Sequence, residues 1–273
     1  MESRGIEMDS ASLGVKKGFQ TRFRKEKRGK SMSDLVRVAV DAMGGDYAPV
    51  EPVKGAIEAV NADERVKVQL VGQVDVIEKE LQKYTYPKER VEIVPATEII
   101  ETGEPPVNAI RHKKDSSIVV GMKKVRYGEA DAFVSSGSTG AVLVGGQTIV
   151  GRIKGVERPP LAPLIPTKDG VSLLIDCGAN VDARPSHLVQ FAMMGSIYME
   201  HVVGIKNPRV GIVNIGVEEE KGNALVKETY PMLKECKDIN FIGSIEARDI
   251  PKGEADVIVT EAVSYTHLRA HET

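Results

Sequence analysis

The feature that most constrains the fold is a series of short apolar runs, rich in valine and isoleucine, which alternate with longer segments of helical spacing. The runs are 36–41 (VRVAVD), 66–72 (VKVQLVG), 91–94 (VEIV), 131–135 (DAFVS), 171–176 (VSLLID), 209–214 (RVGIVN), 239–243 (INFIG) and 255–259 (ADVIV). Strands that are apolar on both faces are typical of a parallel sheet with helices packed against it. The alternation therefore predicts an α/β fold with a mainly parallel sheet.

Most of these runs are separated by segments with helical spacing, for example 141–153 and 224–234. The segment 186–201 (SHLVQFAMMGSIYMEH) is apolar almost all round, and a helix of that kind is usually buried in a core or in a subunit interface. We find no internal repeat along the chain.

Composition argues against several classes of protein. The formal net charge of −2 gives no sign of a polyanionic partner, so we expect no binding to nucleic acid. The two cysteines, Cys177 and Cys236, lie far apart, which predicts no disulfide framework and a reducing cytosol. No apolar run reaches the ~18–20 residues that a membrane-spanning helix needs. No constellation of metal ligands is evident, and we expect neither a metal nor another cofactor.

Both ends of the chain differ from the rest. Residues 1–33 are basic, polar and without apolar periodicity, and we interpret them as a disordered leader. The alternative for this segment is a tail that binds nucleic acid or an anionic membrane. Residues 263–273 (VSYTHLRAHET) fit neither a strand nor a helix period and look like a translated sequencing adaptor. We therefore expect one α/β domain over 34–262, incomplete at its C-terminus, followed by an artefactual tail.

Polar, glycine-containing turns follow four of the predicted strands. The first turn carries Asp41, Gly44, Gly45 and Asp46, and the other three cover 135–140, 176–187 and 214–223. Ligands bind at the carboxyl ends of the strands in open parallel sheets. The four turns are therefore predicted to converge on one rim, although each alone is ordinary turn chemistry.

The turn SSGSTG is the strongest candidate for an anion site. Gly137 and Gly140 permit close approach of the backbone, and hydroxyl groups come from Ser135, Ser136, Ser138 and Thr139. The helix predicted to follow would add its unpaired N–H groups. Neither a GK[ST] sequence nor a G-x-G-x-x-G sequence occurs in the required context, which argues against nucleotide and dinucleotide loops. The alternative is a plain turn that caps the helix.

The two later turns offer other polar groups. Lys221 could complement an anion, with an acidic neighbour to orient it, or belong to a solvated helix start. Asn180 could bind a ligand or hold its loop, and Asn214 ends a predicted strand. Cys177 follows a strand and is expected to be buried rather than nucleophilic.

Several motifs occur together and in order, and they closely resemble those of the bacterial phosphate acyltransferases of phospholipid synthesis, the PlsX family. They are AVDAMGGDYAP, NAIRHKKDSSI, SSGSTGAVL, RPPLAPLIPTKDG, DCGANVD, NIGVEEEKGN and GEADVIV. The resemblance implies a Rossmann-like, three-layer α/β/α sandwich, similar to phosphotransacetylases and to isocitrate-type dehydrogenases. It also implies a cytoplasmic homodimer in peripheral contact with the inner membrane.

The implied reaction is the transfer of a long-chain acyl group from acyl carrier protein to inorganic phosphate. The acyl phosphate would then serve a membrane glycerol-3-phosphate acyltransferase. Within the matched motifs, we expect Ser136, Ser138, Thr139 and nearby amides to bind phosphate or the oxyanion, and Lys221 to be the charge partner. We further expect Asn180 and Asn214 to position the carbonyl, and Asp41 and Asp46 to shape their loop.

Two other functions remain open from the sequence. One is a phosphotransacetylase-like transfer from a small acyl-CoA, which differs in its acyl donor. The other is a non-catalytic binding module that acts through the basic leader, for which steep salt dependence would be diagnostic.

Overall fold

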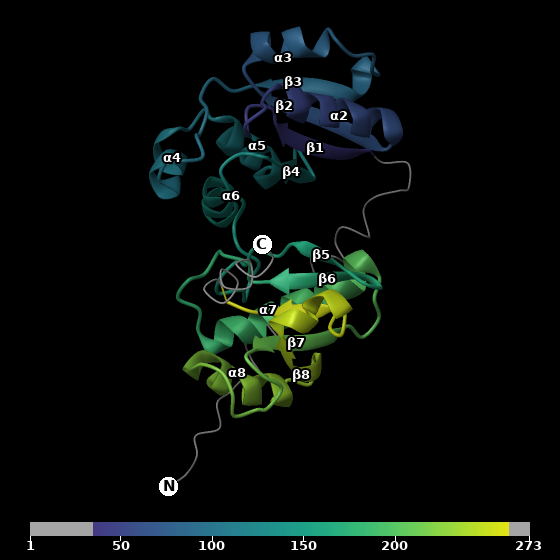
Figure 1. Cartoon of the computed structure of the whole chain (residues 1–273). Helices are drawn as coiled ribbons and strands as arrows, with labels where there is room; N and C mark the ends of the chain where they lie inside the picture. Colours follow the sequence, from purple (N-terminus) through teal and green to yellow (C-terminus); the bar gives the residue numbers. More distant parts are fainter. Residues whose placement is uncertain (1–34, 262–273) are drawn as a thin grey trace. The chain divides into compact units, whose positions relative to one another are not determined.

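The computed structural model describes residues 35–261, which form two compact units (Figure 1). The chain passes from the first unit to the second between Arg152 and Ile153. Each unit has a sheet and hydrophobic clusters of its own. The predicted leader (1–33) and the adaptor-like tail (263–273) lie outside the described residues.

The first unit is built on four parallel strands in the order β3-β2-β1-β4. Its elements are β1 (Val36–Asp41), α2 (Val50–Ala62), β2 (Val66–Gly72), α3 (Val74–Leu81), the 3₁₀ turn η1 (Lys88–Arg90), β3 (Val91–Pro95), α4 (Pro106–His112), α5 (Ser117–Arg126), β4 (Ala132–Val134), α6 (Thr139–Gly145) and the π-helical turn η2 (Gly146–Val150).

Helices cover both faces of this sheet. Val40 and Leu70 point to the face that carries α2 and α3, where Ile57 packs against them. Ala39 and Val71 point to the opposite face, which α5 covers. Since neighbouring residues of a strand face opposite sides, the apolar character of both sets produces a three-layer arrangement. The predicted α/β fold with parallel strands is therefore confirmed.

The second unit has five strands in the order β5-β6-β9-β7-β8, parallel except for β5. Its elements are β5 (Leu164–Thr167), β6 (Gly170–Ile175), α7 (Pro185–Tyr198), the π-helical turn η3 (Met199–Val203), β7 (Arg209–Asn214), α8 (Ala224–Glu235), β8 (Asn240–Glu246), the 3₁₀ turn η4 (Ala247–Lys252) and β9 (Val257–Val259).

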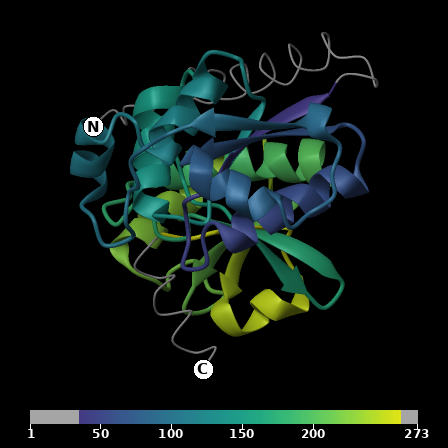
Figure 2. The same cartoon turned by 90° about the horizontal axis from the view of Figure 1, so that it is seen from above.

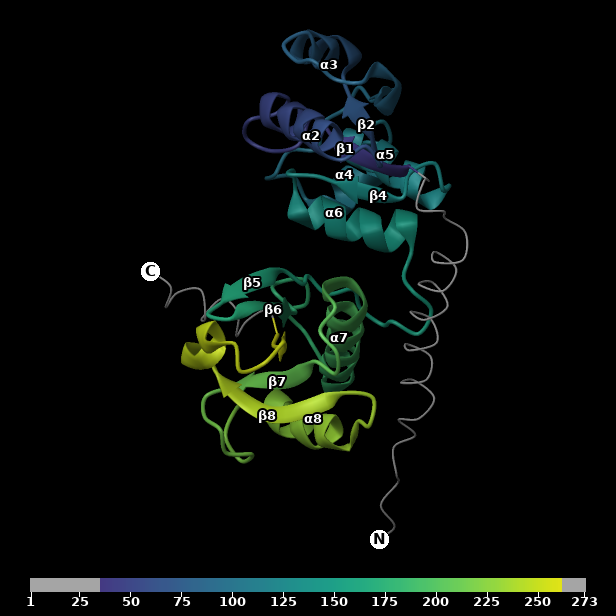
Figure 3. The ribbon, with the colours of Figure 1, turned by 90° about the vertical axis from the view of Figure 1, so that its right-hand side faces the viewer.

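Helices α7 and α8 pack against each other and against one face of the second sheet (Figure 3). Residues on all sides of α7, including Leu188 and Phe191, are buried, so the helix predicted over 186–201 belongs to the core of its own unit. The η4 turn lies beside β5 (yellow beside teal in Figure 2), where Lys168 N–H donates to the carbonyl of Pro251 at 2.9 Å.

The same strand pair occurs in both units, although the sequence analysis finds no internal repeat. GEADAFV (128–134) leads into β4 and GEADVIV (253–259) leads into β9. Strand β1 pairs with β4 as β7 pairs with β9, with Ala39 opposite Phe133 and Gly211 opposite Ile258. The repeat is short and its copies lie far apart in the chain. Only the matching register of the two strand pairs shows that both copies occupy the same structural position.

A bidentate arginine–aspartate contact closes the amino end of each of these strand pairs. Arg37 bonds Asp131 through its backbone N–H (2.8 Å), Nε (3.2 Å) and Nη2 (3.3 Å). Arg209 bonds Asp256 through the same three groups at 2.7, 3.1 and 3.0 Å. Two parallel bonds plus a backbone bond fix the register as well as the contact.

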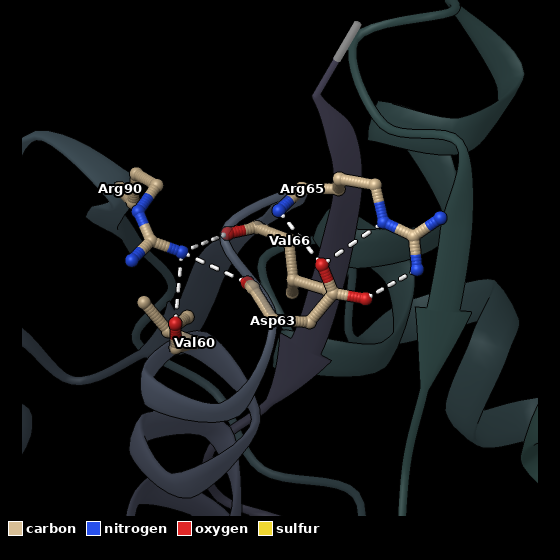
Figure 4. A network of polar contacts seen from close by, with 5 residues as sticks. All are labelled: Val60, Asp63, Arg65, Val66 and Arg90. Carbon is tan, nitrogen blue, oxygen red and sulfur yellow. Dashed lines mark hydrogen bonds and ion pairs between the residues drawn. The ribbon is translucent and has the colours of Figure 1, made fainter. Parts of the chain in front are cut away.

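Arg90 joins helix α2 to strand β2 in the first unit (Figure 4). Its Nη1 lies 2.8, 2.9 and 3.2 Å from the carbonyl oxygens of Val60, Asp63 and Val66. Helix α2 has no basic residue in its own last turn, so Arg90 supplies the cation that its C-terminal carbonyls favour. Arg65 instead bonds the Asp63 side chain on the surface, and this contact lowers the pKa of Asp63 to about 2.

We expect Arg90→Ala to lower the free energy of unfolding by roughly 2–3 kcal/mol, because hydrogen bonds from a charged donor are lost and three carbonyls lose a partner. Urea denaturation measures this change. Arg65→Ala is the matched control, since Arg65 is exposed and its pair is solvated, and it should leave the midpoint almost unchanged. Equal losses for the two variants would contradict this role of Arg90.

The contact between Arg209 and Asp256 should make the free energy of unfolding depend on pH in the acid range. Burial raises the pKa of Asp256, but the bonds from Arg209 outweigh it, and the pKa lies below its usual value. A lowered folded-state pKa stabilises the fold above the unfolded value of about 3.9, and this stabilisation is lost as the pH falls through the folded pKa. Asp256→Asn and Arg209→Gln should therefore be less stable than wild type at pH 7, and the difference should shrink as the pH falls below the unfolded-state pKa of about 3.9. A constant difference between pH 7 and pH 3 would contradict the assignment.

Candidate functional site

The turns after β1 and β4 in the first unit are bonded to each other. Ser135 Oγ donates to Asp41 Oδ2 at 2.7 Å and accepts from Gly137 N–H at 3.0 Å. Asp41 Oδ1 accepts from Met43 N–H at 3.1 Å. Because β1 and β4 are neighbours in the sheet, their carboxyl ends bring residues that are 94 positions apart into contact.

The two turns also touch through their backbones. A Cβ on Gly44 would lie 2.3 Å from Asp41 Oδ2 and 2.8 Å from the amide nitrogen of Gly137, so only glycine fits there. Gly45 has φ +97°, a conformation that side chains rarely adopt, and it lies against Ser136. The predicted glycine pair is thus what permits the close approach of the two turns.

The hydroxyl groups of the SSGSTG turn fall into two sets. Ser135 and Ser138 are turned inward, and Ser138 caps α6 by accepting from Ala141 N–H at 3.3 Å. Ser136 and Thr139 are exposed. A ligand can therefore reach the hydroxyls of Ser136 and Thr139 directly. Helix α6, which follows the turn, has only seven residues before η2 begins.

The remaining residues of this group have simpler positions. Gly140 lies against Pro106, where an added Cβ would come within 2.6 Å of the proline ring. Asp46 is exposed in the turn after β1. The predicted residues of this group lie at the carboxyl ends of β1 and β4 in the first unit, in the two turns or directly beside them. They are Asp41, Gly44, Gly45, Asp46 and 135–140.

The turn after β7 in the second unit is held by Asn214. Its Nδ2 donates to the carbonyl of Lys221 at 3.1 Å and to Ser244 Oγ at 3.2 Å, and its Oδ1 accepts from Ile215 N–H at 2.8 Å. The Lys221 side chain is half exposed and forms an ion pair with Glu218 at 2.8 Å. The hydrogen bond from Lys221 lowers the pKa of Glu218.

The turn after β6 is organised by Asp176, which is fully buried. Asn180 donates to Asp176 Oδ2 from its backbone N–H at 2.7 Å and from Nδ2 at 2.9 Å, and Nδ2 also lies 3.2 Å from the carbonyl of Pro159. Asp176 Oδ1 accepts from Leu161 N–H at 2.8 Å. Asn180 is therefore bonded into its loop, and its contact with a ligand stays a prediction.

Sequence reasoning missed a buried histidine beside this loop. His187 Nδ1 accepts from Arg184 N–H at 3.1 Å, so Nε2 carries the proton and faces Glu157 Oε2 at 3.1 Å. Gln190 Oε1 accepts from Glu157 N–H at 2.9 Å. Partners about 30 residues apart leave no local spacing signal, so only the tertiary structure identifies them.

The candidate residues thus form two groups, one in each unit, at the carboxyl ends of parallel strands. The turns after β1 and β4 are in contact, whereas β9 lies between β6 and β7 in the second sheet. Cys177 and Cys236 are buried, as expected for Cys177. Within residues 35–261, no group of three or more His, Cys, Asp or Glu side chains is placed to hold a metal ion.

Comparison with known proteins adds what geometry alone does not contain. The model of a family described as fatty acid synthesis protein matches residues 36–266. The chain is 49% identical over 238 residues to a putative phosphate acyltransferase of Clostridium perfringens, covering 87% of this chain and 70% of that protein. It is 53% identical over 227 residues to a phosphate acyltransferase of Alkaliphilus oremlandii, covering 83% and 67%.

A solved structure supports the fold. A phosphotransacetylase from Streptococcus pyogenes matches with a TM-score of 0.64 at 14% identity, covering 93% of this chain and 86% of that one. The phosphotransacetylase-like fold that the sequence motifs implied is therefore confirmed.

The inward and outward hydroxyls of the SSGSTG turn should differ in their effect on stability. Ser138→Ala removes the cap of α6 and should lower the free energy of unfolding by about 1 kcal/mol. Ser136→Ala is the matched control, because Ser136 lies two residues away in the same turn and is exposed, and it should be neutral. Chemical denaturation of both variants checks this, and a neutral Ser138→Ala would show that the cap contributes nothing.

Proposed function

The chain belongs to the fatty acid synthesis protein family, and we propose that it transfers an acyl group to inorganic phosphate to form an acyl phosphate. The match over residues 36–266, together with about 50% identity to phosphate acyltransferases, carries this proposal. We further propose that the donor is a long-chain acyl group on acyl carrier protein, as the sequence motifs imply.

The reaction requires a phosphate oxygen to attack the carbonyl carbon of a thioester. A C–O bond forms, the C–S bond breaks, and the carrier leaves as a thiolate that takes up a proton from water. Phosphate is itself the nucleophile, so the protein has to position two substrates and stabilise an oxyanion rather than supply a reactive side chain. This requirement agrees with buried cysteines and with turns whose exposed groups include hydroxyls and a lysine.

Individual roles follow from which groups remain accessible. We assign phosphate contact to the hydroxyls of Ser136 and Thr139 and to the backbone of their turn. Lys221 would supply positive charge to an anionic substrate group, with Glu218 orienting its ammonium. Asn214 would set the path of the Lys221 backbone, and Asn180 would hold the turn after β6; either could reach the thioester carbonyl only by exchanging a present bond.

The assay combines the protein with long-chain acyl carrier protein and phosphate, and traps acyl phosphate with hydroxylamine. Product should form only when phosphate is present. Acetyl-CoA replaces the donor in a parallel reaction, and a preference for it would favour a phosphotransacetylase-like reaction instead. No phosphate-dependent product from either donor would contradict acyl transfer to phosphate.

We also propose that the enzyme acts as a cytoplasmic homodimer at the inner membrane surface and delivers acyl phosphate to a glycerol-3-phosphate acyltransferase. Within the described part of the chain, no helix is long and apolar enough to cross a membrane. Sedimentation with and without anionic vesicles tests both features. A monomer that does not co-sediment would remove them and leave the proposed reaction intact.

Lys221→Ala should lower kcat/KM for phosphate by roughly 10-fold or more, since a charged contact contributes about 1.5–3 kcal/mol. Lys234→Ala is the matched control, because Lys234 is also exposed and pairs with Glu219 of the same turn. It should leave kcat/KM unchanged. Initial rates over a range of phosphate concentrations decide, and an equal loss in both variants would assign the effect to general electrostatics.

A further inference from the structure

Asp41 is a buried side chain whose two oxygens both accept hydrogen bonds from the protein. It is 1% exposed, with Oδ1 bonded to Met43 N–H and Oδ2 to Ser135 Oγ. Ser135 Oγ in turn accepts from Gly137 N–H. A chain of bonds therefore runs from the end of β1 through Ser135 into the middle of the SSGSTG turn, and burial keeps the Asp41 carboxylate from direct contact with a ligand.

The repeated strand pair shows that this chain of bonds is not needed for the strands to pair. Extending the shared register by one step places Asp41 opposite Ser135 in the first unit and Val213 opposite Thr260 in the second. The second pair forms the same parallel register with a valine where the first has the buried acid. The Arg–Asp contact at the amino end is present in both pairs. The Asp41–Ser135 bond is thus specific to the strand pair that carries the hydroxyl-rich turn.

The bond determines how the turn presents its outer groups. Ser136 lies between Ser135, which Asp41 holds, and Gly137, whose N–H is bonded to Ser135 Oγ. Gly44 packs against Asp41 and against the Gly137 amide with no room for a Cβ, so the turn cannot move inward. The backbone position of the exposed Ser136 is consequently set by the bond between the buried Asp41 and Ser135.

We propose that Asp41 and Ser135 are positioning residues that hold the SSGSTG turn in its phosphate-binding conformation without touching phosphate themselves. The inference rests on the proposed function, because it assumes that this turn binds phosphate. Ser135, predicted as one of the hydroxyls of the anion site, is thereby placed beneath the binding groups, and Asp41, predicted to shape its own loop, also supports the neighbouring turn. Such supporting bonds matter because small displacements of a binding group weaken binding and catalysis.

Three substitutions test the pair. Asp41→Asn keeps the size but leaves one acceptor where two are needed, Ser135→Ala removes the link, and Ser135→Thr retains the hydroxyl. We expect the first two to raise the KM for phosphate about 10-fold, with kcat at saturating phosphate within about 2-fold, and Ser135→Thr to stay near wild type. The double variant Asp41→Asn/Ser135→Ala should be no worse than either single variant, since both break one chain of bonds.

Asp131→Asn is the matched control, because Asp131 joins the same two strands at their opposite end. It should lower the thermal midpoint and leave the KM for phosphate unchanged. The positioning role is overturned if Asp41→Asn and Ser135→Ala keep the wild-type KM, or if Asp131→Asn raises it as much as they do. If Asp41→Asn fails to fold, the KM values for phosphate of Ser135→Ala and Ser135→Thr are compared instead.

Direct binding of inorganic phosphate, measured by calorimetry without any acyl donor, separates the two hypotheses. Wild-type binding that weakens about 10-fold in Ser135→Ala supports the positioning role even if no acyl phosphate forms, in which case the proposed reaction fails alone. Binding and acyl transfer that are both insensitive to Asp41→Asn and Ser135→Ala overturn the positioning role alone. A wild-type protein that binds no phosphate overturns this inference together with the phosphate contacts of the turn.

Discussion

The parallel register of β1 with β4, and of β7 with β9, is the constraint on which the candidate turns that follow these strands depend. An arginine–aspartate contact at the opposite end of each pair stabilises this register. In each unit the arginine lies at the start of one strand, as the second residue of β1 and the first of β7. The aspartate directly precedes the neighbouring strand, β4 or β9. Parallel strands that start in step also end in step, so their following turns leave from the same edge. In the first unit that edge is where Asp41 meets Ser135. In the second unit the corresponding edge is where Asn214 bonds the turn that carries Lys221.

Most of the strand pattern could be predicted because buried parallel strands have a strong apolar signal. The predictions for β1, β2 and β7 match the observed bounds, whereas β5 was missed. Strand β5 contains Pro166 and lies at the sheet edge, the position that tolerates proline but hides the strand in the sequence. The helix expected over 141–153 is divided into α6 and η2. The sequence did not predict this division, because apolar spacing does not distinguish α-helical from π-helical hydrogen bonding.

The candidate site was predictable in its composition but not in its internal division of roles. Glycine, serine and aspartate after strands mark the turns, yet sequence alone cannot separate Ser135, which faces inward, from Ser136, which is exposed. That distinction arises from a partner 94 residues away and from the register of two strands. The contact of His187 with Glu157 could not be predicted for the same reason, because the two residues lie far apart in the sequence and meet only in the folded structure.

The contrast between the two copies of the strand pair connects structure to chemistry. A valine at the place of Asp41 serves the hydrophobic core of the second unit, whose partly buried Val213 packs beside Ile245 and Ile258. Replacing such a residue by a buried acid costs stability unless both oxygens are bonded, and in the first unit both are. Where the strands only have to pair in register, replacing the valine by an aspartate brings no benefit. A turn that must hold exposed hydroxyls in a fixed position relative to an anion gains rigidity, because its conformation is then set by a bond to a buried carboxylate.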